Sequence, residues 1–151
     1  MRAIIQRVTN ASVTVEGSVV SSIGKGLCVL VGITHEDTVK DLDYIVKKIL
    51  NLRLFENAEG KFWANSVKDS ELEILCVSQF TLYAETKKGS KPDFHKAMKS
   101  DLSSAFYGKF LDSLKKAYVA EKIKDGVFGA MMQVNINNDG PVTISIDSNK
   151  D

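Results

Sequence analysis

The chain has 151 residues, a formal net charge of +1 at pH 7 and a hydrophobic content of 44%. This length suits one domain with one core, and the composition is that of an ordinary globular protein. The near-zero charge excludes a global field that would draw the protein onto nucleic acid or a membrane, so a polyanionic partner requires a local basic patch. No apolar run approaches the roughly 18 residues of a membrane span, so we expect no contact with a membrane.

The first third of the chain predicts short strands joined by tight turns. Residues 2–8 alternate between the two faces of a strand, and residues 12–15 and 18–23 predict a hairpin. Residues 27–33 are almost wholly apolar and predict a strand that is buried on both faces. Arg7 lies in the first of these strands, where a charge is unexpected, and the residue type alone favours an exposed edge position.

Two amphipathic segments predict the main helices. Thr38 can cap the first one, with Asp41 as the acid of a capping box, and residues 39–50 then repeat apolar side chains at helical spacing. Ser100 is the expected cap of the second helix, in which residues 102–118 keep the same spacing. Both helices therefore have one apolar face that packs on a sheet.

The strand predicted for residues 72–77 ends in an unusual way. It is followed by Ser78, Gln79, Phe80 and Thr81, so three hydrogen-bonding side chains occur where a core strand normally stays apolar. In an extended backbone, Gln79 and Thr81 would share one face and Ser78 and Phe80 the other. The residues alone leave two interpretations open: a strand that runs out into a polar loop, or a strand end whose backbone N–H groups point into a cleft.

The remaining segments complete an α+β pattern. Residues 52–55 predict a strand, residues 85–95 a long polar surface loop, and residues 131–136 and 142–146 the two final strands. Gly140-Pro141 is then the turn that joins those two strands, and because an X–Pro bond is cis in only about one case in twenty, the sequence does not predict a cis bond.

Eight or more short strands and two long helices in a single domain, residues 1–151, predict a curved, mostly antiparallel sheet or partial barrel that carries the helices. Residues 147–151 form a polar tail that we expect to fray.

The sequence indicates neither a metal site nor a cofactor. His35 and His95 are the only histidines, and no HExxH or Cys/His spacing is present. Cys28 and Cys76 lie inside apolar runs, where we interpret them as buried small hydrophobes of a reducing compartment. The N-terminus lacks the apolar region of a secretory signal, so the cytoplasm is the default location, and a nuclear pool is left open.

Two stretches together resemble the paired signatures of the D-aminoacyl-tRNA deacylases. They are residues 78–82 (Ser-Gln-Phe-Thr-Leu) and residues 138–143 (Asn-Asp-Gly-Pro-Val-Thr). One short match would be weak evidence, but further matches follow in the same order along the chain, at residues 1–8, 51–53, 91–95 and 126–129. The resemblance is therefore specific and covers essentially the whole chain.

The resemblance implies a homodimer of barrel-like subunits, without a cofactor, that hydrolyses the ester between a D-amino acid and the terminal ribose of tRNA. In that family the first signature lines the pocket for the terminal adenosine and the aminoacyl group, and a cis Gly–Pro pair reaches into the pocket of the partner subunit. Carried onto this chain, the substrate-binding residues would be Ser78, Gln79, Phe80, Thr81, Phe128, Met132, Gly140 and Pro141.

The same resemblance implies a role for each group. Gly140 and Pro141 would form the chirality filter, and Arg7 would hold them in place. Backbone carbonyls at this filter can accept the α-amino group of a D-residue and exclude an L side chain, whereas glycyl esters, including glycyl-tRNA mischarged on tRNA(Ala), would pass. Apart from the resemblance, the backbone N–H groups of Phe80 and Thr81 are our candidate oxyanion donors. The Thr81 side chain could be a nucleophile, but its hydroxyl needs a base and none is adjacent in the sequence. The resemblance suggests instead that the ribose hydroxyl of the substrate and water carry the chemistry.

Lys87, Lys88 and Lys91 lie in the polar loop and are either solvated charges or phosphate contacts for the acceptor end of tRNA. The competing class is a nucleic-acid-binding module without catalysis, because animal proteins resembling this family have been linked to replication-origin DNA. Near-zero net charge and the lack of a groove-binding helix speak against DNA as the main ligand. A third alternative is a general hydrolase of small esters.

Overall fold

The computed structural model describes residues 1–151, in which six strands, two α-helices and two short 3-10 helices follow one another. The element bounds are β1 Arg2–Val15, β2 Ser18–Ile23, β3 Gly26–Gly32, α1 Val39–Asn51, β4 Glu73–Ser78, η1 Phe80–Tyr83, α2 Ser100–Ala117, η2 Ala120–Lys122, β5 Ile123–Asp125 and β6 Gln133–Asp147.

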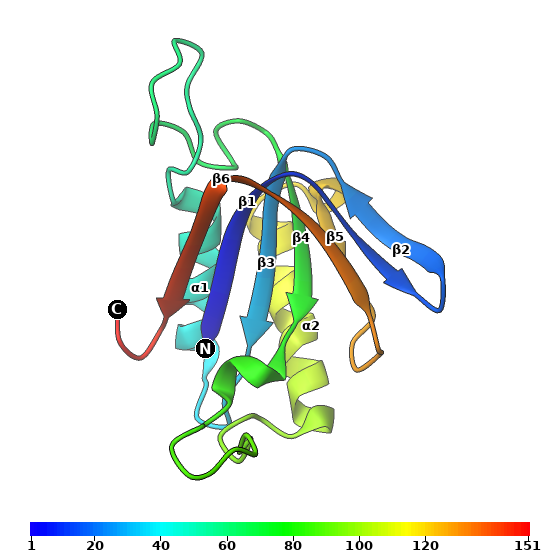
Figure 1. Cartoon of the computed structure of the whole chain (residues 1–151). Coiled ribbons are helices and arrows are strands. Elements are labelled where there is room, and N and C mark those ends of the chain that lie inside the picture. Colours follow the sequence, from blue (N-terminus) through cyan, green and yellow to red (C-terminus); the bar gives the residue numbers. More distant parts are fainter.

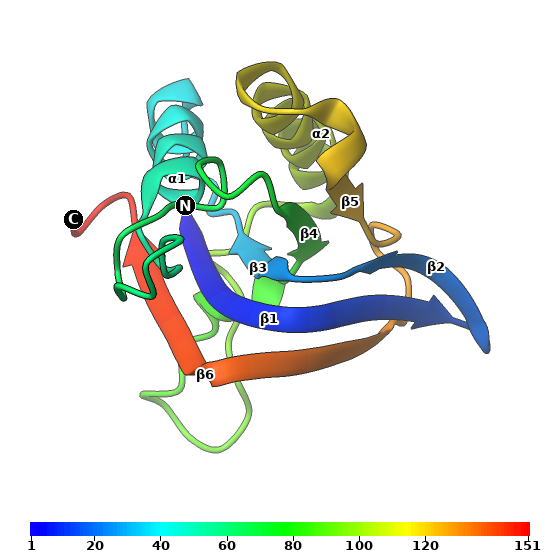
Figure 2. The same ribbon diagram turned by 90° about the horizontal axis from the view of Figure 1, so that it is seen from above.

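All six strands form one strongly curved sheet (Figures 1 and 2). β1 pairs antiparallel with β3 and β2 along one edge and with β6 along the other. β4 lies between β3 and β5 and is parallel to both. The α+β class, the curved sheet and the two main helices are thus confirmed, and the sheet is mixed: its antiparallel part surrounds β1 and its parallel part surrounds β4.

Several local expectations about the strands are wrong. Six strands replace the eight or more expected, because β1 and β6 each continue where the sequence suggested a break. β6 runs through Gly140 and Pro141, so this pair is not a turn between two strands. Residues 52–55 form no strand either; Phe55 makes a single bridge to Asn65.

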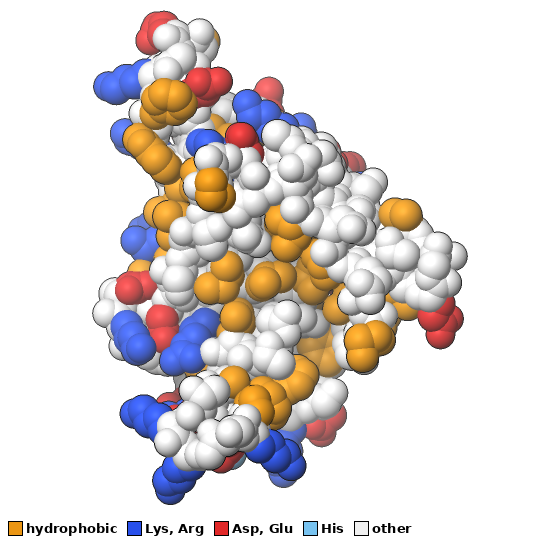
Figure 3. Space-filling view, viewed as in Figure 1, with side chains coloured by type: hydrophobic (Ala, Val, Ile, Leu, Met, Phe, Trp, Pro, Cys, Tyr) orange, Lys and Arg blue, Asp and Glu red, His pale blue; other side chains and the backbone are white.

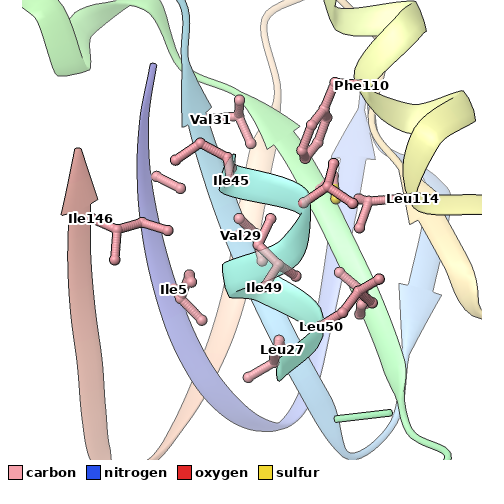
Figure 4. Close-up of a cluster of buried hydrophobic side chains, with 14 of the residues drawn as sticks. Ile5, Leu27, Val29, Val31, Ile45, Ile49, Leu50, Phe110, Leu114 and Ile146 are labelled. Atoms are coloured by element: carbon pink, nitrogen blue, oxygen red, sulfur yellow. The ribbon is translucent and has the colours of Figure 1, made fainter. Parts of the chain in front are cut away.

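Both helices cover the same face of the sheet (Figure 2). In the core between them, Ile45 and Ile49 of α1 and Phe110 and Leu114 of α2 are buried and lie over β3 and β4, with Val29 beneath (Figure 4). Neither helix combines the length and the apolar character needed to cross a membrane. The two cysteines are buried and unpaired, as expected.

The two helices begin differently. Thr38 is the N-cap of α1, and the Asp41 carboxylate accepts its backbone N–H at 2.8 Å, which confirms the predicted capping box. Ser100, in contrast, is already the first residue of α2, and its expected capping role is wrong. The N-cap is Lys99, and no side chain caps the helix.

The chain termini meet beside the start of α1. The fully buried Met1 ammonium pairs with the buried Asp37 carboxylate and donates to Ser148 Oγ at 2.8 Å. Burial raises the pKa of Asp37, against the opposing effect of hydrogen bonds from the Met1 amine and the Thr34 N–H. Because the Ser148 hydroxyl also donates to Asp41, the tail that we expected to fray is held at its beginning.

Candidate active site

A pocket of about 730 Å³ opens where the C-terminal end of β4, the start of α2 and the loop before β6 meet. Most of its lining residues are hydrophobic. In Figure 3, hydrophobic side chains gather in the hollowed middle of this face, and lysine and arginine side chains surround its lower end. A concave, mainly apolar pocket with a few polar groups is the usual form of a binding site for a small organic group.

The end of β4 supplies the polar groups of the pocket. Ser78 is the last residue of the strand, and the chain then turns into η1 instead of staying extended, so Gln79 and Thr81 do not share a strand face. Ser78, Gln79 and Phe80 line the pocket, whereas Thr81 does not. The Thr81 hydroxyl accepts a hydrogen bond from the side-chain amide of Gln79.

The turn at η1 leaves backbone donors available. The first N–H groups of any helix have no partner within it, and here these groups belong to Phe80 and Thr81. The Gln79 N–H is used, because it donates to the Val31 carbonyl at 2.7 Å and extends the pairing of β4 with β3. Of these two residues Phe80 lines the pocket, and Thr81 follows it directly in the sequence.

The opposite wall is the segment between β5 and β6, which contains Phe128 and Met132. Phe128 lies against Tyr107 of α2, with ring centroids 5.8 Å apart. The Tyr107 hydroxyl donates to the Asp125 carboxylate at 2.7 Å, and the same oxygen accepts the N–H of Gly126. Burial raises the pKa of Asp125, although these two hydrogen bonds act in the other direction.

A third wall was not predicted. Phe94, from the polar loop, meets Phe80 edge to face with ring centroids 5.1 Å apart, and it lines the pocket together with Ser100 and Ser103 of α2. The loop is held by a bridge between Glu85 and Asp93. In the sequence, Phe94 was marked only by the match of residues 91–95 to the family pattern, and that match suggested no role for its aromatic ring.

Gly140 and Pro141 lie outside this pocket. Both are exposed, and the bond between them is cis. They belong to residues 139–142, which leave the β1–β6 ladder opposite Arg7. Figures 1 and 2 show that β6 bends near its middle. Within one chain, the two halves of the predicted site are therefore separate.

Arg7 is not an edge residue, because β1 has paired strands on both sides. Its side chain is only 15% exposed and forms an ion pair with Asp139, with 3.2 Å between Nε and Oδ2. Nη1 donates to the Leu54 carbonyl at 2.8 Å. A Cβ added at Gly140 would approach Nη2 of Arg7 to 3.3 Å, so the arginine packs directly against the glycine.

Lys87, Lys88 and Lys91 are exposed in the loop between η1 and α2, away from the pocket lining. The acidic and basic side chains of this loop that do pair are Glu85, Asp93, His95 and Lys96. Hydrogen bonds from the backbone and the ring of His95 lower the pKa of Asp93. No three His, Cys, Asp or Glu side chains come together in a way that could hold a metal ion.

Comparison with known proteins extends over nearly the whole chain. The family model described as D-Tyr-tRNA(Tyr) deacylase matches residues 4–147. D-aminoacyl-tRNA deacylase 1 of Danio rerio is 61% identical over 148 residues, which are 98% of this chain and 71% of that protein. D-aminoacyl-tRNA deacylase of Drosophila melanogaster is 62% identical over 148 residues, with 98% and 92% covered.

A solved structure named c-Myc DNA Unwinding Element Binding Protein has the same fold. It superposes with a TM-score of 0.94 at 58% identity and covers 97% of this chain and 98% of its own. The first signature in the pocket, the matching family model and these relatives agree: the chain belongs to the D-Tyr-tRNA(Tyr) deacylase family, and it is a hydrolase.

Proposed function

We propose that this protein hydrolyses the ester that joins a D-amino acid to the terminal ribose of tRNA. The observation that carries the proposal is the pocket into which β4 delivers Ser78, Gln79 and Phe80, in a chain whose relatives are named D-aminoacyl-tRNA deacylases. Its volume of about 730 Å³ suits a group the size of an aminoacyl-adenosine. Such a reaction belongs to translation, so the proposed compartment is the cytoplasm.

The chemistry needs little from side chains. An aminoacyl ester is activated, so orientation of the ester and stabilisation of the oxyanion are the main requirements. The proposed oxyanion donors are the backbone N–H groups of Phe80 and Thr81, which begin η1 and so lack a partner within it. Water attacks the carbonyl carbon, the bond to the ribose oxygen breaks, and the products are a free D-amino acid and tRNA with its terminal hydroxyl restored.

Stereochemical selection is assigned to Gly140 and Pro141 of a second copy. Both residues are exposed and absent from the pocket of their own chain, which supports a role in a neighbouring subunit. Their carbonyl oxygens accept hydrogen bonds from the α-ammonium group of a D-residue, while an L side chain would collide with the backbone. A wall of backbone atoms discriminates more strongly than a soft apolar pocket, which separates ligands that differ by a methylene by only ~1–3 kcal/mol.

This filter acts on the side chain and not on the ester. A glycyl group has no side chain to exclude, so glycyl-tRNA mischarged on tRNA(Ala) is a second proposed substrate. Arg7 supports the filter, because it contacts Gly140 and is itself fixed by Asp139 and the Leu54 carbonyl.

The tRNA is held by charge and not by base reading. Lys87, Lys88 and Lys91 are exposed on the loop that follows η1, so they are the proposed contacts to the acceptor-end phosphates. Affinity should fall as the salt concentration rises. The proposed recognition is therefore of the acceptor end and not of the base sequence.

The name of the 58% identical solved structure, c-Myc DNA Unwinding Element Binding Protein, favours one alternative, a protein that binds DNA without catalysis. The formal net charge of +1 offers no broad attraction to a duplex. Without catalysis, neither D- nor L-aminoacyl-tRNA would be hydrolysed.

One assay separates the candidate functions: the same tRNA is charged with D- and with L-tyrosine, and the hydrolysis rates are measured with enzyme in excess. The proposal predicts rapid release of the D-amino acid and near-background release of the L-amino acid. Equal rates for both would indicate a general ester hydrolase. Background rates for both, with duplex DNA bound tightly at physiological salt, would replace the proposal with the DNA-binding alternative.

A further inference from the structure

The side chain of Asn138 connects the two ends of the segment that carries Gly140 and Pro141. The ladder between β1 and β6 is regular up to Asn137, which faces Asn10; after a register shift Asn138 faces Val8, and pairing resumes at Thr143, which faces Gln6. Residues 139–142 therefore leave the ladder opposite Arg7 alone. An excursion of this kind from a strand needs its own hydrogen bonds to have a fixed shape.

Asn138 supplies these bonds at both of its polar atoms. Its Oδ1 accepts the backbone N–H of Val142 at 3.0 Å, and its Nδ2 donates to Thr143 Oγ1 at 2.9 Å. The side chain of the residue before the excursion is thus tied to the last residue of the excursion, Val142, and to the residue after it, Thr143. We refer to these two hydrogen bonds as the Asn138 clamp.

Packing restricts the same segment from the other side. Val142 is buried in the main core, so the end of the excursion is anchored. A Cβ added at Gly140 would lie 2.8 Å from Val142 Cγ2 and 3.0 Å from the Val142 nitrogen, and Gly140 has a φ of +124°. Its backbone therefore lies close against the residue that the clamp holds. A shift of Val142 would displace the exposed Gly140 and Pro141 directly.

We propose that Asn138 is a positioning residue that sets the stereochemical preference of the enzyme by fixing Gly140 and Pro141 through Val142 and Thr143. The inference rests on the proposed function. Asn138 does not line the pocket of its own chain, and its role in the proposal is to fix the geometry of the filter. Without the clamp, the carbonyl oxygens of the filter lose their fixed position, and an L side chain is no longer excluded.

The test compares single-turnover hydrolysis of D- and L-tyrosyl-tRNA by the full-length protein and four variants. Asn138→Ala removes the clamp and should lower the D-over-L rate ratio by about tenfold, the effect of one to two hydrogen bonds. Asn138→Asp should retain most of the ratio, because a carboxylate still accepts from the Val142 N–H and from the Thr143 hydroxyl. Thr143→Val removes one bond of the clamp, together with the longer 3.4 Å bond from the Gln6 amide, at an exposed site and should give an intermediate ratio.

The matched control is Asn137→Ala. Asn137 is exposed, adjacent in sequence and paired with Asn10 within the regular ladder, so this variant should keep the wild-type ratio. Thermal melts identify any variant that has lost its fold. If Asn138→Ala is unfolded, the D-over-L rate ratio of Thr143→Val tests the inference in its place.

A purely structural role for Asn138 would lower both rates together and leave the ratio unchanged, which would overturn the inference. The proposed function fails in a different way, because then the wild-type protein itself would show no preference for the D-substrate.

Discussion

Thr81 is the side chain for which a covalent role is most easily imagined and least supported. Its hydroxyl accepts from the Gln79 amide, it does not line the pocket, and no base lies next to it in sequence. We therefore predict that Thr81→Ala lowers the single-turnover rate of D-aminoacyl-tRNA hydrolysis by less than about tenfold, whereas loss of a true nucleophile typically costs several orders of magnitude.

The control for this prediction is binding. The dissociation constant for a non-hydrolysable D-aminoacyl-adenosine analogue should stay within a few-fold of the wild-type value in Thr81→Ala. An undetectable hydrolysis rate combined with unimpaired binding of the analogue would contradict the backbone mechanism and make Thr81 a nucleophile.

Individual site residues differed in how far the sequence could identify them. Ser78, Gln79 and Phe80 stood out because polar residues at the end of an apolar strand are unusual, and the structure places them in the pocket. Phe94 was missed, because a phenylalanine in a polar loop gives no local signal, and only the folded chain brings it to Phe80. Arg7 was misjudged from residue type alone, since the sequence does not show that β6 returns to cover β1.

At the scale of elements, the contact between β3 and β4 depends on Gly26. Gly26 faces Glu73 in the parallel ladder, and an added Cβ would lie within bonding distance, 1.9 Å, of the Glu73 carbonyl oxygen. We predict that Gly26→Ala lowers the free energy of unfolding by about 1–3 kcal/mol, as overpacking does, because the two strands must separate. Urea denaturation monitored by circular dichroism measures the difference.

Gly24→Ala is the matched control for this substitution. Its added Cβ would meet only the side-chain oxygen of Glu73, at an ordinary contact distance of 3.6 Å. The unfolding free energy of this variant should stay within about 0.5 kcal/mol of wild type, as at most surface sites. Equal losses of unfolding free energy for both variants would mean that the backbone preference of glycine, and not its close approach to Glu73, causes the effect.

Elements with local signals were predicted well, and those set by distant partners were not. The β1–β2 hairpin and the capped start of α1 follow from turn and capping residues within a few positions. β6 appeared as two strands because Gly and Pro normally interrupt a ladder, yet β1 offers a partner on both sides of the excursion. Residues 52–55 have the composition of a strand, but apart from the bridge at Phe55 they find no neighbour to pair with.

At the scale of the whole molecule, a single chain leaves one edge of β6 without a strand partner. β6 pairs only with β1, and Gly140 and Pro141 protrude from it. A long unpaired edge is normally covered in a native protein. A second copy on this edge would both cover it and carry the exposed dipeptide to another pocket, so we expect a homodimer by analytical ultracentrifugation.

Cross-subunit placement of the filter makes a strong prediction for mixed dimers. Pro141→Ala should lower the D-over-L ratio of its homodimer by about tenfold. Ala130→Trp, in the pocket wall, should block the site of its own chain. In a purified heterodimer of the two variants, the open pocket of one subunit meets the unchanged Gly140 and Pro141 of the other. The D-over-L ratio should therefore return to the wild-type value, at about half of the wild-type rate.

A filter that acts within its own chain predicts the opposite outcome. The only open pocket in the heterodimer would then be served by the altered dipeptide of the same subunit, and the ratio would stay at the low value of the Pro141→Ala homodimer. The two homodimers are the controls, since one should be active and unselective and the other inactive. Because both substitutions are present in every heterodimer, their effects on folding are constant, and only the geometry of assembly separates the two results.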